Sequence, residues 1–354
     1  MGWMQWDLFC RVIDNHGDLG VCWRLAVALV QRGQRVRLWV DDATALAWMA
    51  GDAGAGVEVL DWARSEAGVA PGEVVVEAFG CALPEVFVRR MARAAPAPVW
   101  INLEYLTAQA YAERSHRLAS PQAAGAGAGL RKWFYYPGYT AHTGGLLREP
   151  DLAARQRDFD ATAWLARLGV ARRPGERVVS VFCYEQAALP DLLDALTARP
   201  TVLLACIGAA QTQVRAALPG GARGALRVLA LPALSQADYD HLLWASDLNF
   251  VRGEDSLVRA QWAAKPFVWQ AYEQSDGAHH AKVQALLDRL VQGRTDALAA
   301  QVRALWSRWN AQARGRVALP ALPPWQDLCV RWRHSLCAQP DLCTQLLGFV
   351  AETR

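Results

Sequence analysis

Two aspartates stand in one short polar segment, Asp14-Asn15-His16-Gly17-Asp18-Leu19-Gly20. The apolar run before it, residues 6–13, predicts a buried strand, and residues 19–31 predict an amphipathic helix. Ligands of open α/β sheets bind beyond the carboxyl ends of the strands, so the segment is expected at a binding edge. An ordinary helix N-cap needs only one such side chain. The second acid, the amide and the glycines therefore favour a functional role for at least one of Asp14 and Asp18.

A second junction, Arg252-Gly253-Glu254-Asp255-Ser256, combines a cation with the expected start of a helix. Residues 248–251 predict a strand, and Gly253 permits a tight turn after it. The N–H groups and the dipole at a helix start favour anions, and the Arg252 guanidinium matches phosphate oxygens. The Glu254 carboxylate suits ribose or sugar hydroxyls instead. The alternative is a capped helix with an interdomain salt bridge.

Two other patterns predict no site. A dinucleotide fingerprint needs a strand before it and a helix after it, but Gly125-Ala126-Gly127-Ala128-Gly129 follows Ser120-Pro121-Gln122, which predicts a flexible loop instead. Asp276, His279 and His280 lack a further ligand at persuasive spacing. We therefore expect no metal.

Short apolar runs alternate with helical stretches in two series, which implies parallel sheets with helices on both faces. The expected strands are 6–13, 36–40, 57–60, 74–77 and 99–103, then 178–183, 202–207, 228–231, 248–251 and 267–269. Tyr184 follows the first strand of the second series, where its hydroxyl would suit a phosphate, although an aromatic residue at a strand end commonly packs. With 354 residues the chain exceeds one ordinary core of roughly 250–300. Two Rossmann-like domains facing a central cleft are expected.

Composition excludes several classes of protein. The chain is 53% hydrophobic with a net charge of +3 and no dense run of Lys or Arg, so we expect no nucleic-acid partner. No apolar run reaches the roughly 18–20 residues that span a bilayer, and residues 6–13 are too short and too charged for a signal peptide. The eight cysteines form no C-x-x-C pair. A reducing cytoplasm fits them best.

Long motifs spread over most of the chain share one family resemblance. They are FCRVIDNHGDLGVCWRL (9–25), WINLEYL (100–106), PGYT (137–140), TGGLL (143–147), FCYE (182–185), LLWASDLNFVRGEDS (242–256), QWA (261–263) and PFVWQ (266–270). In these motifs the chain resembles the bacterial protein-arginine rhamnosyltransferases that modify elongation factor P, the EarP family.

The resemblance implies a GT-B fold. An N-terminal acceptor domain is expected over residues 1–155 and a nucleotide-sugar domain over residues 170–322. The proline pair Pro323-Pro324 would redirect the chain, so a helical segment, residues 323–354, is expected to pack back on the N-terminal domain. The resemblance further implies dTDP-β-L-rhamnose as co-substrate, no cofactor, and inverting transfer to an arginine of elongation factor P.

By motif, Asp14 and Asp18 correspond to the essential acids of the family. The residues expected at the donor are Asn15, Gly17, Phe182, Tyr184, Gln236, Tyr239, Arg252, Glu254, Asp255 and Ser256. Ala233 stands where an aromatic residue that stacks on thymine is expected. Tyr239 is the nearest aromatic residue that would replace it.

The mechanism that these residues would support begins with an acceptor guanidinium, whose pKa is above about 12. A carboxylate does not deprotonate it in advance but accepts a proton as the C–N bond forms. We assign Asp18 as this base and Asp14 as the group that orients the guanidinium, although the two roles are exchangeable. Arg252, Tyr184 and the helix start would stabilise the leaving diphosphate without a metal.

Two other functions remain open on the residues alone. One is a GT-B transferase that acts on a small molecule or lipid, since only the acceptor would differ. The other is a nucleotide-sugar-binding protein without catalysis, against which the paired acids argue. A dehydrogenase is disfavoured because the glycine fingerprint is missing.

Overall fold

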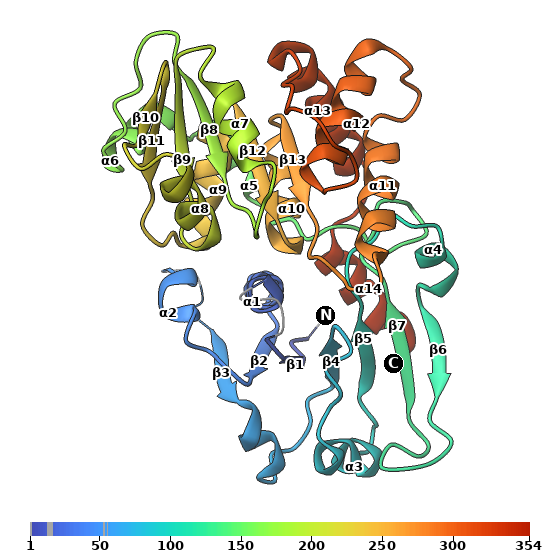
Figure 1. Ribbon diagram of the computed structural model, residues 1–354. Coiled ribbons are helices and arrows are strands. Elements are labelled where there is room, and N and C mark those ends of the chain that lie inside the picture. The colour runs from blue at the N-terminus through green and yellow to red at the C-terminus, as the bar shows by residue number, and fades with distance from the viewer. Residues whose placement is uncertain (1, 13–16, 52–53, 55) are drawn as a thin grey trace. The chain divides into compact units, whose positions relative to one another are not determined.

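The computed structural model describes residues 2–12, 17–51, 54 and 56–354. It divides into two compact units, of which unit 1 comprises Met1–Pro150 with Ala338–Arg354 and unit 2 comprises Asp151–Cys337. Each unit is an α/β fold on a mainly parallel sheet (Figure 1). The predicted class of two Rossmann-like domains is confirmed. Within the described ranges, no helix combines the length and the apolar character that a membrane span requires.

Among the described residues, the sheet of unit 1 has seven strands in the order β3-β2-β1-β4-β5-β7-β6. All neighbours pair in parallel except β6 and β7, which are antiparallel. The strands are β1 (Gln5–Cys10), β2 (Arg35–Val40), β3 (Val57–Asp61), β4 (Val74–Ala78), β5 (Val99–Leu103), β6 (Leu118–Pro121) and β7 (Arg131–Tyr135). Strands β4 and β5 are buried along their whole length. Their continuous apolar sequences match strands that are covered on both faces.

The helices of unit 1 cover this sheet. They are α1 (Gly17–Val30), α2 (Leu46–Met49), the 3₁₀ helix η1 (Trp62–Glu66), α3 (Glu85–Arg93), α4 (Tyr111–Ser115) and α14 (Leu342–Thr353). In α1 the apolar side chains of Leu19, Cys22, Leu25 and Leu29 are all buried in the core of unit 1. Their spacing of three and four residues places them on one helix face. The predicted helix after the first strand is confirmed.

The last helix, α14, completes the core of unit 1 although it follows unit 2 in the sequence. Phe349 packs edge-on against Trp133 of β7, and α14 lies beside β5 and β7 in Figure 1. The Leu342 N–H donates to the Leu146 carbonyl at 2.9 Å. A Cβ at Gly145, whose φ is +71°, would lie 2.6 Å from the Pro340 carbonyl oxygen. Gly145 of the TGGLL motif therefore leaves room for the returning chain.

Unit 2 contains a six-stranded sheet in its described residues, with the order β10-β11-β9-β8-β12-β13. All pairs are parallel except the short β10–β11 pair. The strands are β8 (Arg177–Val181), β9 (Thr201–Ala205), β10 (Ala222–Arg223), β11 (Leu226–Ala230), β12 (Leu248–Arg252) and β13 (Phe267–Gln270). The predicted strands of the second series all correspond to members of this sheet.

The helices of unit 2 include a pair held by a buried salt bridge. They are α5 (Leu152–Arg157), α6 (Ala161–Arg167), α7 (Leu189–Leu196), α8 (Ala209–Ala217), α9 (Gln236–Ala245), α10 (Glu254–Ala263), α11 (Ala278–Leu290), α12 (Ala297–Trp309) and α13 (Leu322–Cys337). The Arg259 guanidinium of α10 donates two hydrogen bonds of 2.8 Å to the Asp240 carboxylate of α9. Both side chains are almost fully buried. Arg155 of α5 lies 3.9 Å from the same carboxylate.

The boundaries between the units differ from those expected. The segment 323–354 does not pack as one piece on unit 1, because α13 belongs to unit 2. Trp325 near the start of α13 is fully buried, and Trp332 donates a hydrogen bond of 2.9 Å to Gln261 of α10. The chain therefore returns to unit 1 at Cys337–Ala338 and not at the proline pair. The first crossing is at Pro150–Asp151, so α5 lies in unit 2.

Removing one partner of the buried pair is expected to destabilise the protein strongly. Arg259→Met removes the two hydrogen bonds that the guanidinium donates to the buried Asp240 carboxylate, so the free energy of unfolding should fall by about 3–5 kcal/mol. Urea unfolding followed by circular dichroism measures it. The double variant Asp240→Leu with Arg259→Met removes both charges and should lose less than the single variant. Equal losses for both would contradict a dominant ion-pair effect.

His116 should make the stability of unit 1 depend on pH. Its Nδ1 accepts a hydrogen bond of 3.1 Å from the Tyr136 N–H, and burial together with the nearby Arg117 lowers its pKa to about 4. Above about pH 6.5 the ring is neutral in both states, whereas between that value and about pH 4 only the unfolded chain takes up the proton. The free energy of unfolding should therefore fall as the pH decreases through this window.

Denaturant titrations between pH 7 and pH 4 test this dependence. His116→Asn keeps an acceptor for the Tyr136 N–H but does not titrate, so its curve should be flatter than that of the wild type. His142→Gln is the matched control because His142 is exposed. If His142→Gln flattens the curve as much as His116→Asn does, the assignment to His116 is wrong.

Candidate active site

The strand order of each sheet identifies its binding edge. In open α/β sheets, ligands bind at the carboxyl ends of the strands where the order of connections reverses. The reversal lies between β1 and β4 in unit 1, and between β8 and β12 in unit 2. Asp18 follows β1, whereas the predicted donor segments follow β8 and β12. Asp18 and the segments that follow β8 and β12 therefore stand at the reversal point of their own sheet.

The Arg252 side chain, at the end of β12, contacts two aromatic rings that follow β8. Its Cζ lies 4.3 Å from the centroid of the Phe182 ring and 4.4 Å from that of the Tyr184 ring. The Phe182 N–H donates to the Phe250 carbonyl of β12 at 2.9 Å, which extends the pairing of the two strands past β8. Stacking on aromatic rings fixes the orientation of a guanidinium. Such preorganisation is what binding of a phosphate group requires.

The start of α10 lies directly after Arg252. Gly253 is its N-cap, with φ of +67° and ψ of −175°, a conformation that favours glycine. The Gly253 carbonyl accepts a hydrogen bond of 2.9 Å from the indole N–H of Trp269 on β13, which holds the turn between β12 and α10 in place. Glu254 and Asp255 form the first turn of α10, and the Ser256 side chain is buried. The predicted combination of a guanidinium with a helix N-terminus is thus present in the structure.

Gln236 and Tyr239 lie on α9, of which Gln236 is the first residue. The Tyr239 ring packs edge-on against Phe182 with a centroid distance of 5.7 Å, and its hydroxyl oxygen is buried. Burial raises the pKa of the Tyr239 phenol far above its ordinary value, more than the neighbouring Ser256 lowers it. Tyr239 therefore stays protonated, and its ring supports the Phe182 ring, which contacts Arg252. Ala233, on the loop before α9, is exposed.

Two glutamines hold the loop after β8 in place, although the sequence alone indicated no role for them. The Gln270 side chain accepts from the Tyr184 N–H and donates to the Glu185 carbonyl, each at 3.0 Å. Gln213 donates to the Tyr184 carbonyl at 3.0 Å and accepts from the Gln186 N–H at 2.7 Å. Together they fix the backbone on both sides of Tyr184. The motif PFVWQ contained Gln270, but only the pairing of β12 with β13 shows what it does.

In unit 1, Asp18 lies in the first turn of α1 and its side chain is buried. Gly17 is the first residue of that helix. The predicted residues Asp14 and Asn15 lie outside the described residues. A carboxylate at a helix start is stabilised by the helix dipole. This placement fits both a capping aspartate and a catalytic base.

A further acidic and aromatic cluster follows β4 and β5 at the same edge of unit 1. The Phe79 ring, in a residue with φ of +57°, stacks on Tyr105 at a centroid distance of 4.3 Å. Asn102 accepts from the Gly80 N–H at 3.1 Å and donates to the Glu104 carboxylate at 2.7 Å. Left-handed backbone in a residue with a side chain costs energy, and such strain clusters at functional sites.

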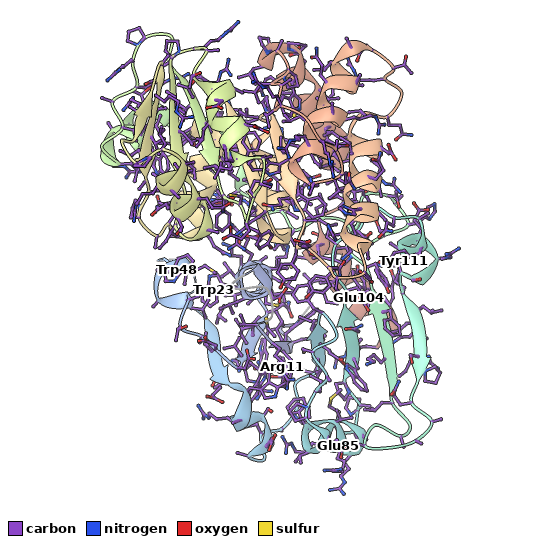
Figure 2. The ribbon with its side chains drawn as sticks, viewed as in Figure 1. Arg11, Trp23, Trp48, Glu85, Glu104 and Tyr111 are labelled. Carbon is purple, nitrogen blue, oxygen red and sulfur yellow. The ribbon has the colours of Figure 1, made fainter. Side chains whose placement is uncertain are left out.

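The Glu104 carboxylate faces the tyrosines that adjoin this cluster. Burial, reinforced by the Glu104 charge, raises the pKa of Tyr136 to about 12. In Figure 2, Glu104 and Tyr111 lie at one end of unit 1 and Glu85 at the other. A carboxylate near aromatic rings suits a guanidinium ligand. The motif WINLEYL contains Glu104 and Tyr105, but sequence reasoning assigned them no role.

The patterns set aside in the sequence have local structural roles. His279 Nδ1 accepts a hydrogen bond of 3.1 Å from the Gln274 N–H, and Asp276 accepts from the Ala278 N–H at 3.0 Å. No group of three or more His, Cys, Asp or Glu side chains in the described part of the chain is placed to hold a metal ion. The Gly-Ala segment 125–129 lies in the turn between β6 and β7.

Residues 6–351 match the family model described as Elongation-Factor P (EF-P) rhamnosyltransferase EarP. The chain belongs to this family. It is 42% identical to a protein-arginine rhamnosyltransferase of Pseudomonas aeruginosa, over 98% of this chain and 99% of the relative. A protein-arginine rhamnosyltransferase of Neisseria meningitidis serogroup B is 32% identical, over 98% and 96% of the two chains.

Solved structures agree with this assignment. The chain resembles a structure that describes EarP-mediated arginine glycosylation of translation elongation factor EF-P, with a TM-score of 0.71, 32% identity and coverage of 99% of this chain and 100% of the other. The glycosyltransferase VinC, in complex with dTDP, shares the fold at a TM-score of 0.53 and 13% identity, over 99% and 100% of the two chains. The protein is thus a glycosyltransferase with the two-domain GT-B architecture.

Proposed function

We propose that the protein transfers L-rhamnose from dTDP-β-L-rhamnose to an arginine side chain of elongation factor P, with inversion at the anomeric carbon. The main structural support for this proposal is the Arg252 guanidinium, which stacks on Phe182 and Tyr184 beside the start of α10. It belongs to a chain that matches protein-arginine rhamnosyltransferases over nearly its whole length. The free thiols of all eight cysteines suit a reducing compartment, so we place the reaction in the cytoplasm.

On the donor side, the proposal assigns the diphosphate to Arg252, Tyr184 and the N-terminus of α10. As the bond from the anomeric carbon to the diphosphate breaks, negative charge grows on the leaving oxygens. A guanidinium already fixed by stacking and a helix dipole stabilise that charge without reorganising. Glu254 accepts hydrogen bonds from sugar or ribose hydroxyls. Gln236, Asp255, Ser256, Asn15 and Gly17 complete the proposed donor contacts.

On the acceptor side, Asp18 accepts a proton from the guanidinium as the new C–N bond forms. The acceptor is not deprotonated beforehand, because its pKa is above about 12. A carboxylate aligned with one N–H holds the nitrogen in line with the anomeric carbon and takes the proton in the same step. Asp14 orients the rest of the guanidinium in this scheme. Glu104 and its neighbouring tyrosines are a second cation-binding group at the same edge of unit 1.

Intact-mass spectrometry of elongation factor P after incubation with this protein and dTDP-rhamnose tests the function. One deoxyhexose should be added, and replacement of the target arginine by lysine should abolish the addition. A short peptide that carries the same arginine should react more slowly than the intact factor. Transfer to a small molecule or lipid, with elongation factor P unmodified, would support the alternative acceptor class instead.

Asp18→Asn should reduce transfer by roughly 10²–10⁴-fold while dTDP binding is kept. Asparagine retains the size and one acceptor oxygen but takes up no proton at neutral pH. Asp61→Asn is the control, since Asp61 caps a helical turn by accepting from the Ala63 N–H and asparagine caps equally well. Near-normal turnover of Asp18→Asn in the mass assay would make Asp18 a helix cap and Asp14 the base.

Arg252→Ala should lower both dTDP affinity and turnover, the affinity by about tenfold or more, because a charged partner of the diphosphate is lost. Arg252→Lys keeps the charge but not the planar fork, so it should restore the affinity only in part. Arg215→Ala removes an exposed arginine of α8 and should change neither quantity. Calorimetric titration with dTDP measures the affinities. Unchanged affinity of Arg252→Ala would rule out the donor assignment.

A further inference from the structure

A cavity of about 770 Å³ lies in unit 2 at the edge opposite to the proposed donor site. Its lining includes Arg177, which begins β8, Pro200, which precedes β9, and Asp247, which precedes β12. These residues stand at the amino ends of the strands, whereas the Phe182 and Arg252 segments stand at the carboxyl ends. The volume is that of a pocket for a small organic ligand. The cavity is therefore a separate candidate site.

Two arginines of the lining carry charges that nothing in the described chain neutralises by direct contact. The strand register pairs Arg177 with Thr201, and the Arg177 N–H donates to the Pro200 carbonyl at 2.8 Å. Arg199 therefore lies next to Arg177, on the segment that leads into β9. Neither guanidinium makes a hydrogen bond or an ion pair to a described residue. Burial and the Arg199 charge lower the pKa of Arg177, whereas Asp247 acts in the opposite direction. Two like charges thus face one cavity.

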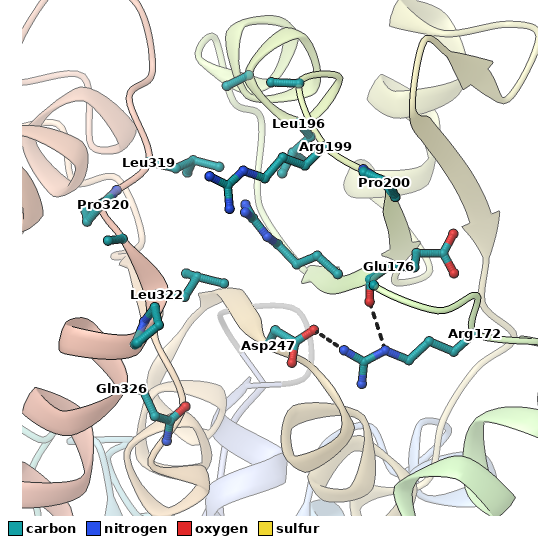
Figure 3. A pocket seen from close by; sticks show the side chains of 16 residues that line it. Arg172, Glu176, Leu196, Arg199, Pro200, Asp247, Leu319, Pro320, Leu322 and Gln326 are labelled. Carbon is teal, nitrogen blue, oxygen red and sulfur yellow. Dashed lines mark hydrogen bonds and ion pairs between the residues drawn. The ribbon is translucent and has the colours of Figure 1, made fainter.

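The acids of the lining are already compensated by other partners. The Asp247 carboxylate accepts from Arg172 and from the Val178 N–H, each at 2.8 Å. Glu176 accepts two hydrogen bonds from Arg227, at 2.7 and 2.8 Å. Figure 3 shows Arg172 directed at Asp247, away from Arg199. The uncompensated charge of the cavity is therefore positive.

The opposite wall is apolar. Leu319, Pro320 and Leu322 line it and face Arg199 across the cavity in Figure 3. Gln326 is the polar side chain of this wall, and its amide donates to the Ala264 carbonyl. A ligand that fills the cavity thus meets cations on one side and hydrocarbon on the other.

We propose that this cavity binds a small phosphate monoester whose organic part is apolar or aromatic. A phosphate monoester carries close to two negative charges at neutral pH, which matches two guanidinium groups, whereas a single carboxylate would leave one unmatched. Binding removes the repulsion between Arg177 and Arg199. The organic part displaces water from the leucine and proline wall.

Phenyl phosphate is a suitable probe, measured by saturation-transfer NMR and calorimetric titration of the full chain. Arg177→Gln combined with Arg199→Gln should weaken the affinity of the cavity for phenyl phosphate by at least tenfold. Arg173→Gln is the matched control, because it removes an exposed neighbouring charge that does not line the cavity, and it should change the affinity less than twofold. Arg252→Ala should leave binding at the cavity intact.

Several outcomes would overturn the proposal. Loss of phenyl phosphate binding in Arg252→Ala but not in the double variant would place the anion at the donor edge. Equal affinity in the double variant and the wild type, or no binding to the wild type, would exclude the cavity as a phosphate site. Equally tight binding of inorganic phosphate would exclude the role of the apolar wall. Thermal unfolding should show the double variant folded and no less stable, since repulsion is removed.

Discussion

The buried pair between Asp240 and Arg259 fixes the two helices on which the proposed donor site is built. Two parallel hydrogen bonds of 2.8 Å join a planar fork to a carboxylate, so they constrain the rotation of α9 against α10 as well as their separation. Tyr239 precedes Asp240 on α9, and Glu254 begins the helix that carries Arg259. A change in the pair would therefore be transmitted to both helix starts at the binding edge.

The aromatic contacts of Arg252 depend on that frame. Phe182 packs against both Arg252 and Tyr239, so the guanidinium, the ring after β8 and the helix α9 form one continuous contact. Gln270 and Gln213 then hold the backbone around Tyr184, which supplies the second ring. Each of these side chains is thus held by hydrogen bonds or packing from another, an arrangement that favours a preorganised site.

Local patterns were sufficient to predict the parts of the fold that local sequence controls. The buried strands are short apolar runs, and α1 has one continuous apolar face, so both were visible in the sequence. Strands β6 and β7 were not predicted, because both are short and only partly buried, and the sequence of β7, RKWFY, begins with two cations. The crossing at Cys337 was also missed, because the proline pair suggested a break where α13 begins.

The same distinction applies to the candidate site. The glycine and acidic residues made the junctions after β1 and β12 recognisable in the sequence. The family resemblance assigned Phe182 and Tyr184 to the donor site. The roles of Gln213 and Gln270 could not be predicted, because each glutamine reaches a loop that is distant in sequence. Which loops become neighbours depends on the strand order. The left-handed backbone of Phe79 likewise has no glycine to signal it.

The path of the chain imposes an order on its assembly at the ribosome. All of unit 2 is made before α14, yet Leu346, Phe349 and Val350 of α14 belong to the core of unit 1. The nascent chain therefore passes through a stage in which unit 2 has its whole sequence while unit 1 exposes the apolar groove that α14 will cover. An exposed apolar surface of this kind binds chaperones and is prone to aggregation. Gly145, which is synthesised before unit 2, leaves the space for the Pro340 carbonyl when the returning segment completes unit 1.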